Sequence, residues 1–338
     1  MKARLLRPSS AVIFITVAAS LSGSVVSAAP TRVVRRGDAI RPNAASTALT
    51  SYTVEVPIVT RTVGTAFFRT AIDISNTTSS GTAAVPVVAR LQYSYNRINP
   101  DHTTSFFRTP DPTSPRGQPL NINLLAFDNF HTDDIVQYLG SLNALESGAA
   151  ENSFGTLDVT FENLPSAQGW EGTVSARTYS PNPTGGGTLA IAYPASLFFE
   201  SASQTLVATI RDTQTSPSEA GALRTNIGIR NTDIRNTLQN ATVQVTFYDV
   251  TTGSPTNGQR VGTALTLTLR SGEVLQLNNI RATAGIPNNV TAMLAYADVL
   301  GASATGPTIE GYVNLLDGVT QDGAFFEMKC ADTDGCDN

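Results

Sequence analysis

Residues for acid–base and nucleophilic chemistry are few in this chain. Its 338 residues include 2 histidines, His102 and His131. A serine or cysteine hydrolase needs a nucleophile, a base beside it and a group that orients the base. Neither a Gly-x-Ser-x-Gly turn nor a His-Glu-x-x-His helix occurs. We expect His102 to be solvated in a loop and His131 to make local hydrogen bonds before a helix cap at Thr132. The sequence therefore predicts a protein that is not an enzyme and that holds no cofactor.

Two carboxylates alone can hydrolyse a glycoside, so acidic residues offer an alternative. The candidates in the first part of the chain are Asp158, Glu162 and Glu171. Their spacing singles out no pair. A carbohydrate-active hydrolase that uses two carboxylates is therefore one alternative function.

The C-terminal tail, residues 330–338, contains both cysteines of the chain, Cys330 and Cys336. In an exported protein these two would most simply form a disulfide. The tail also has acidic residues of the kind that bind calcium through hard oxygen ligands, namely Asp332, Asp334 and Asp337. Their spacing does not match an EF-hand loop, so calcium is the weaker of the two interpretations.

Candidate binding residues lie in a long stretch rich in Pro, Thr and Ser, from Asn96 to Pro119. Loops of this length are commonly functional or disordered. The stretch carries aromatic and cationic side chains that could anchor a partner, namely His102, Phe106, Phe107 and Arg108. The alternative interpretation is that Phe106 and Phe107 belong to a strand that packs on its own sheet.

Trp170 is the only tryptophan and lies in an expected turn. An exposed tryptophan could stack on a sugar ring or anchor a protein partner. Burial in a core is the more usual fate of this residue type. Trp170 is therefore a second candidate for binding.

The elements that must position these residues are strands. Residues 68–76 and 223–231 both read apolar-Arg-Thr-x-Ile-x-Ile-x-Asn. Because side chains alternate between the two faces of a strand, the isoleucines of each copy should face a core and the arginines should face outward. The outward residues would include Arg69, Arg224 and Arg230. The repeat predicts two copies of one β domain.

The fold class that follows is all-β, with two tandem immunoglobulin-like β-sandwich domains after a signal peptide. The second copy is expected to lack both the long loop and the short helix that Thr132, Asp133 and Asp134 cap in the first. The expected divisions are a signal peptide at 1–28, a flexible leader at 29–51, β-sandwich domain 1 at 52–195, β-sandwich domain 2 at 196–329 and the tail at 330–338.

The N-terminal segment and the composition predict the compartment. Lys2, Arg4 and Arg7 precede an apolar run at 11–21 and small residues that end at Ala28, which is typical of a secretory signal peptide. The run is too short for a membrane span, which needs about 20 apolar residues. Removal of the segment 1–28, with its three positive charges, would change the net charge from −5 to −8. An acidic surface argues against nucleic acid or anionic membrane as a partner.

The expected location is secreted or extracellular, with the periplasm as the other destination and no membrane span in the mature chain. The run at 224–231 and the ending at 317–325 resemble a motif of secreted bacterial proteins built from paired β-sandwiches. That resemblance implies the tandem fold but no activity and no functional residues. The chain is thus predicted to be a non-enzymatic protein for binding or adhesion at the cell exterior, with an unknown protein or glycan as its ligand. A structural subunit of an extracellular assembly, in which strand edges pair between copies, is the other alternative.

Overall fold

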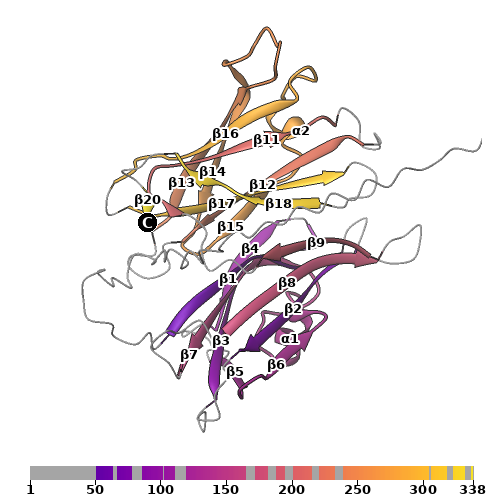
Figure 1. Ribbon diagram of the computed structural model, residues 1–338, viewed down its shortest axis with the longest axis vertical. Helices are drawn as coiled ribbons and strands as arrows, with labels where there is room; N and C mark the ends of the chain where they lie inside the picture. The colour runs from indigo at the N-terminus through magenta and orange to yellow at the C-terminus, as the bar shows by residue number, and fades with distance from the viewer. Residues whose placement is uncertain are drawn as a thin grey trace, which may run out of the picture. The chain divides into compact units, whose positions relative to one another are not determined.

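Strands make up nearly all of the regular structure in the computed structural model of this chain (Figure 1). The structure describes residues 51–338 except 64–66, 78–85, 102, 111–118, 165–171, 182–187, 195–200, 215–220, 233–238, 304–305, 318–322, 332–335 and 338. The described residues fall within one compact unit of the chain, Val33–Asn338. The predicted signal peptide lies outside them, as does the expected boundary at residue 195. In this part of the chain, no helix is long and apolar enough to cross a membrane.

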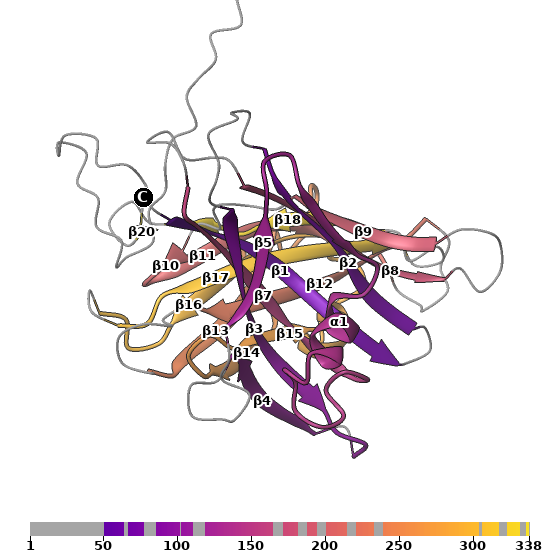
Figure 2. The same ribbon diagram turned by 90° about the horizontal axis from the view of Figure 1, so that it is seen from below.

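The first half, residues 51–194, contains one nine-stranded antiparallel sheet and one helix. Its elements in chain order are β1 (Ser51–Val63), β2 (Phe67–Asn76), β3 (Val87–Ile98), β4 (Thr104–Thr109), β5 (Leu120–Leu124), β6 (Asn129–Thr132), α1 (Ile135–Ser141), β7 (Ser153–Glu162), β8 (Gly172–Pro181) and β9 (Thr188–Pro194). One set of strands pairs in the order β5-β3-β7-β1 and another in the order β6-β2-β8-β9. Short pairing at the ends of β1 and β2 joins the sets, and α1 lies against these two strands (Figure 2).

The second half, residues 201–337, contains a six-stranded and a five-stranded antiparallel sheet. Its elements are β10 (Ser201–Ala202), β11 (Thr205–Arg211), β12 (Leu223–Asn231), β13 (Ala241–Asp249), β14 (Arg260–Leu269), β15 (Val274–Leu277), α2 (Ile280–Ala284), β16 (Ala292–Val299), β17 (Ile309–Asp317), β18 (Gly323–Glu327), β19 (Lys329–Cys330) and β20 (Cys336–Asp337). Pairing in the orders β14-β13-β16-β11 and β15-β12-β17-β18 repeats the two orders of the first half. The repeat seen in two short stretches of sequence thus extends to the strand pairing of both halves.

The second half also has a helix, so the expectation that it lacks one is wrong. Helix α2 lies between β15 and β16, as α1 lies between β6 and β7. In α1 the N-cap is Asp134, which accepts a hydrogen bond from the backbone of Gln137. The cap thus falls within the predicted run 132–134, two residues after Thr132. In α2 the cap is Asn279, in the left-handed conformation, and the helix ends at Gly285 with φ 65°. The helix has five residues, too few to show a helical period in the sequence.

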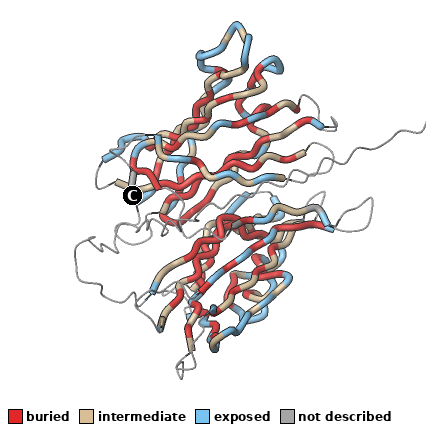
Figure 3. Tube along the Cα trace, viewed as in Figure 1, coloured by how far each residue is buried: buried red, intermediate tan, exposed pale blue. Residues whose placement is uncertain are grey.

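The two strands that carry the repeated motif, β2 and β12, bury their isoleucines. Ile72, Ile74, Ile227 and Ile229 are fully buried, within separate hydrophobic clusters in the two halves. Buried segments are present in both halves (Figure 3). In β2, buried and half-buried residues alternate from Thr70 to the end of the strand. In β12 both faces are buried. The prediction of a half-buried strand is therefore confirmed for β2 and wrong for β12.

The predicted long loop contains a strand. β4 pairs with β3, with Phe107 opposite Tyr95, so the loop prediction is wrong for residues 104–109. The Phe107 and Tyr95 rings lie 5.8 Å apart. The strand forms because β3 extends to Ile98, so that the backbone of β4 can pair with its edge. Side chains of the two strands then lie opposite each other. The alternative interpretation, a strand that packs on its own sheet, holds for Phe106 and Phe107.

Candidate binding site

The predicted binding residues that the structure describes lie on β4. The Arg97 guanidinium lies over the Phe107 ring, 5.3 Å from its centroid. Arg108 lies near Phe106 and donates hydrogen bonds to the carbonyl oxygen and hydroxyl of Ser271 in the second half. Arg108 thus joins the two halves. His102 and Trp170 lie outside the described residues.

His131 is hydrogen-bonded, as the sequence predicts, but its main partner is not local in the chain. Its Nδ1 lies 2.9 Å from Asp73 Oδ1, and its Nε2 lies 3.4 Å from Asp133 Oδ1. The hydrogen bond to Asp73 is the main reason that the pKa of His131 is raised above its ordinary value. The ring is exposed and lies away from the cavity described below.

Two of the carboxylates considered for glycoside hydrolysis lie in the described part of the chain, and each is paired with an arginine. Glu162 pairs with Arg90 at the surface, 2.9 Å apart. Asp158 is buried on β7 and binds Arg230 of β12 through both guanidinium Nη atoms, at 3.3 and 2.8 Å. Glu171 lies outside the described residues. The two described candidates therefore supply no acid–base pair.

Arg230 is buried, so the prediction that it faces outward is wrong. Its side chain is 3% exposed and also contacts Glu55 of β1, while Glu310 Oε2 lies 3.9 Å from its Nη1. Burial alone would lower the pKa of Arg230, but Asp158, Glu55 and Glu310 raise it above the ordinary value. The prediction fails because the outer face of β12 is covered by the first half. We call Arg230, Asp158, Glu55 and Glu310 the buried ion cluster.

An apolar cluster accompanies the buried ion cluster and also draws on both halves. It is formed by Ile58, Tyr193, Val274 and Tyr312. Gly228 of β12 makes room for Tyr312, since a Cβ atom at that position would overlap the tyrosine ring. The tyrosine hydroxyl donates a 3.0 Å hydrogen bond to Gln276. The joint between the halves is thus packed and hydrogen-bonded.

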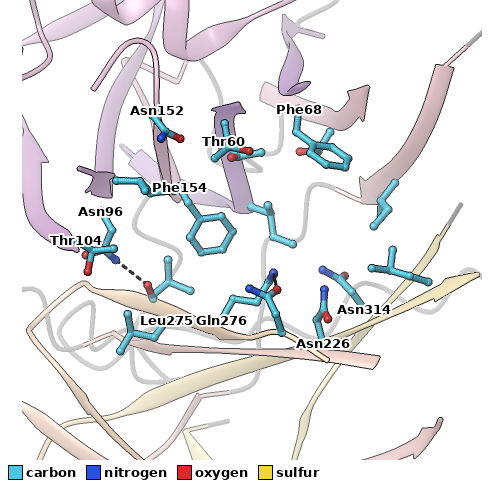
Figure 4. Close-up of a pocket in the computed structure, with 18 of the residues that line it drawn as sticks. Thr60, Phe68, Asn96, Thr104, Asn152, Phe154, Asn226, Leu275, Gln276 and Asn314 are labelled. Atoms are coloured by element: carbon cyan, nitrogen blue, oxygen red, sulfur yellow. Dashed lines mark hydrogen bonds between the residues drawn. The ribbon is translucent and has the colours of Figure 1, made fainter. Parts of the chain in front are cut away.

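Beside this joint is a cavity of about 670 Å³ (Figure 4). Its walls come from β1, β2, β3, β4, β7, β8 and β9 of the first half and from β12, β15 and β17 of the second. Apolar side chains such as Phe68, Phe154 and Leu275 share the lining with many carboxamides. The carboxamides are Asn96, Asn99, Asn152, Asn226, Gln276, Asn278 and Asn314.

Three of these carboxamides have a buried oxygen without a hydrogen-bond partner in the protein. They are Oδ1 of Asn96, Asn152 and Asn314. Asn96 and Asn314 are each only 3% exposed. Asn96 uses its Nδ2 to donate a 3.0 Å hydrogen bond to Val274 of the other half. These three oxygens are covered by protein, so a ligand in the cavity would reach them only after the carboxamide turns toward it.

Charge in the cavity is limited to one side chain among the described residues. Arg224 lines it, and partial burial lowers the pKa of its guanidinium. Every other described lining residue is uncharged. The described lining thus combines apolar and carboxamide side chains with one guanidinium.

Two features of the sequence, apart from the predicted binding residues, signal this site. At outward positions β12 has Asn226, Gly228 and Arg230 where β2 has Ala71, Asp73 and Ser75. Strand β17 runs Tyr-Val-Asn-Leu-Leu from 312 to 316, so apolar residues fall on both faces. Strands with two apolar faces are generally covered on both sides. Both features mark the second half as the one whose outer face is covered.

The C-terminal tail is described only in part. Cys330 is half-buried on β19, and β20 pairs Cys336 with Ala202 through the backbone. The side chain of Cys336 lies outside the described residues, so the disulfide stays a prediction. Asp332, Asp334 and the side chain of Asp337 also lie outside them. Elsewhere, the described residues contain no group of three or more potential metal ligands.

Comparison with known proteins adds no relative: no protein-family model matches the chain, and no curated protein sequence matches it significantly.

Proposed function

We propose that this chain is a non-enzymatic binding protein of the cell exterior and that the cavity beside the joint is its ligand site. The observation that carries the proposal is the set of partnerless buried oxygens on Asn96, Asn152 and Asn314. A buried polar group without a partner costs about 1–3 kcal/mol of stability. Apolar residues of similar shape would avoid this cost, so the carboxamides are better explained by a ligand that pairs with them.

The proposal includes a finer description of the fold. Each half would be an immunoglobulin-like β-sandwich, with one strand set packed on the other around its own hydrophobic cluster. Ligand sites are common where two domains meet. Export through the N-terminal segment would place the site outside the cytoplasm, where a protein or glycan ligand is accessible.

A subunit of an extracellular assembly is a second candidate, which one observation favours. Phe326 is 51% exposed on β18, a strand that pairs only with β17 among the described strands. Strand edges with exposed apolar residues can pair between copies. This candidate does not explain the carboxamides of the cavity, so we place it second.

Saturation-transfer NMR with a mixed library of small uncharged compounds tests the binding proposal. Compounds should bind the wild-type protein and lose binding in Thr62→Trp, which would fill part of the cavity. Thr263→Trp, at an exposed position of β14, is the matched control and should bind as the wild type does. Circular dichroism would verify that both variants fold. If no compound binds, or if the folded Thr62→Trp variant binds as well as the control, the cavity is not the ligand site.

A further inference from the structure

We infer that the ligand of this cavity is a neutral sugar, either a monosaccharide or a short oligosaccharide. The inference rests on the proposed function and names the chemical class of the ligand. It follows from the hydrogen-bonding groups of the lining, from one aromatic ring and from the way in which the walls are built.

The carboxamides match the hydroxyl groups of a sugar. A carboxamide has an acceptor oxygen beside a donor nitrogen, and neighbouring sugar hydroxyls can each donate and accept. Asn314 and Asn96 each bring a buried oxygen without a protein partner to the wall. Once its carboxamide turns toward the cavity, such an oxygen can accept from a ligand hydroxyl but cannot pair with an apolar or purely accepting ligand. The lining therefore selects a ligand that carries several hydroxyl donors.

Phe154 supplies a flat apolar surface beside these polar groups. It is half-buried on β7, and Figure 4 shows its ring between the strands of the first half and Leu275 and Gln276 of the second. A pyranose ring has an apolar C–H face that can pack on an aromatic ring, while its hydroxyls point outward to polar groups. A volume of about 670 Å³ lies within the range of about 300–1,000 Å³ for small-ligand sites.

The construction of the walls favours a sugar over an extended peptide. Strand β12 is hydrogen-bonded on both sides, to β15 and β17. Its residues at the cavity, Arg224 and Asn226, alternate along the strand and thus present side chains from one face. Peptides in extended form are generally bound by adding to a free strand edge through the backbone. A wall of sheet-face side chains instead suits a ligand with hydroxyls of its own.

Calorimetric titration of the full chain with defined probes tests the inference. The sugar probes are maltose, cellobiose, lactose and mannobiose, and the comparison probe is N-acetyl-trialanine amide. We expect at least one sugar to bind in the sub-millimolar range and the peptide not to bind. Asn314→Leu should weaken sugar binding by about tenfold or more, because it removes an acceptor at the ligand. Asn121→Leu, at an exposed position of β5, is the matched control and should bind like the wild type.

Stability separates a binding role of Asn314 from a structural one. Because its oxygen has no partner in the protein, Asn314→Leu should not lower the melting temperature. If that variant does not fold, Phe154→Leu is titrated in its place, and we expect it to bind sugar more weakly because the ring is lost. Binding of the peptide amide alone, or sugar binding that neither variant weakens, would overturn the sugar inference and leave the proposed function standing. If no probe and no library compound binds, the proposed function fails as well.

Discussion

Single residues on one strand decide how the two halves of this protein meet. Strands β2 and β12 share a motif, yet their outward positions hold Ser75 in the first copy and Arg230 in the second. Ser75 is half-buried, whereas Arg230 lies in the buried ion cluster with acidic residues from both halves. A buried charge is tolerated only when it is paired. An arginine at this position of β12 thus needs carboxylate partners, and the first half supplies Glu55 and Asp158.

Replacement of Arg230 by Met should therefore destabilise the protein strongly. It would remove the guanidinium from beside the buried carboxylates Glu55, Asp158 and Glu310. Loss of one partner of a buried ion pair costs about 3–5 kcal/mol. Urea unfolding followed by circular dichroism would measure the change. Arg90→Met, which breaks the surface pair with Glu162, is the control and should cost about 0–1 kcal/mol. Equal losses in the two variants would contradict the role of the buried ion cluster.

The raised pKa of His131 predicts a pH effect that NMR can measure directly. The folded-state pKa lies above the ordinary value of 6.5, mainly because of the hydrogen bond to Asp73. Protonated His131 therefore stabilises the fold below about pH 6.5, and this contribution is lost as the pH rises through the folded pKa. Asp73→Asn should lower the His131 pKa in an NMR titration. Asp133→Asn should lower it less, since that contact is longer and weaker. A larger effect from Asp133→Asn would contradict this assignment.

At the scale of elements, β2 and β12 have the same structural role, each in its own half. Each ends on a buried asparagine whose Nδ2 donates two hydrogen bonds to carbonyl oxygens. Asn76 donates to Leu124 and Leu125, and Asn231 donates to Gln239 and Leu269. The asparagine thus holds the end of the strand against a neighbouring segment in each half, which explains why the motif ends on this residue.

Alanine at these asparagines should destabilise both halves alike. Asn76→Ala and Asn231→Ala each leave carbonyl oxygens without a donor, at a cost of about 1–3 kcal/mol. Asn121→Ala, at an exposed position of β5, should cost close to nothing. Chemical denaturation of the three variants would measure these costs. If only one of the two buried asparagines matters, the strands are not structurally equivalent.

Ile72 and Ile227 should likewise be equivalent core positions. Both are fully buried, so truncation to Ala should cost about 2–5 kcal/mol through lost contacts and a residual cavity. Arg69→Ala should cost about 1 kcal/mol or less, because Arg69 is half-buried and its guanidinium stacks on Tyr179. Denaturation midpoints would compare the three variants. A cost for Arg69→Ala equal to that for Ile72→Ala would contradict this division of the two faces of β2.

At the scale of the whole described unit, charge, packing and hydrogen bonds all cross between the halves. The buried ion cluster, the contact of Arg108 with Ser271 and the hydrogen bond from Asn96 to Val274 do so. In Figure 1, β9 and β18 lie side by side at this joint, and the Tyr193 and Phe325 rings are 5.2 Å apart. The cavity is lined by strands of both halves, so the candidate site exists only when the halves are joined.

Because of this joint, the intact protein should unfold in one cooperative thermal transition. Differential scanning calorimetry would show a single peak whose calorimetric and van't Hoff enthalpies agree. The Arg230→Met variant weakens the joint and should broaden the peak or divide it in two. Two well-separated transitions in the wild-type protein would contradict the coupling of the halves.

The sequence by itself determined the local features of this protein. Strand alternation and the recurring Arg-Thr-x-Ile-x-Ile-x-Asn motif predicted the all-β fold and the buried isoleucines, because these depend on the period of a strand. The short helix after Thr132, Asp133 and Asp134 was also predictable, since its cap is adjacent to it in the chain. The partner of His131 was not, because Asp73 is 58 residues away and is brought to it by the pairing of β2 with β6.

Only the tertiary structure decided which strand faces are covered and where a ligand could bind. Arg230 meets Asp158 across 72 residues of chain, and Asn96 meets Val274 across 178. Phe106 and Phe107 became part of a strand because β3 offered its edge. Periodicity reports which residues share a face but not what covers that face. The covering surface comes from the packing of distant segments, and that packing builds the cavity.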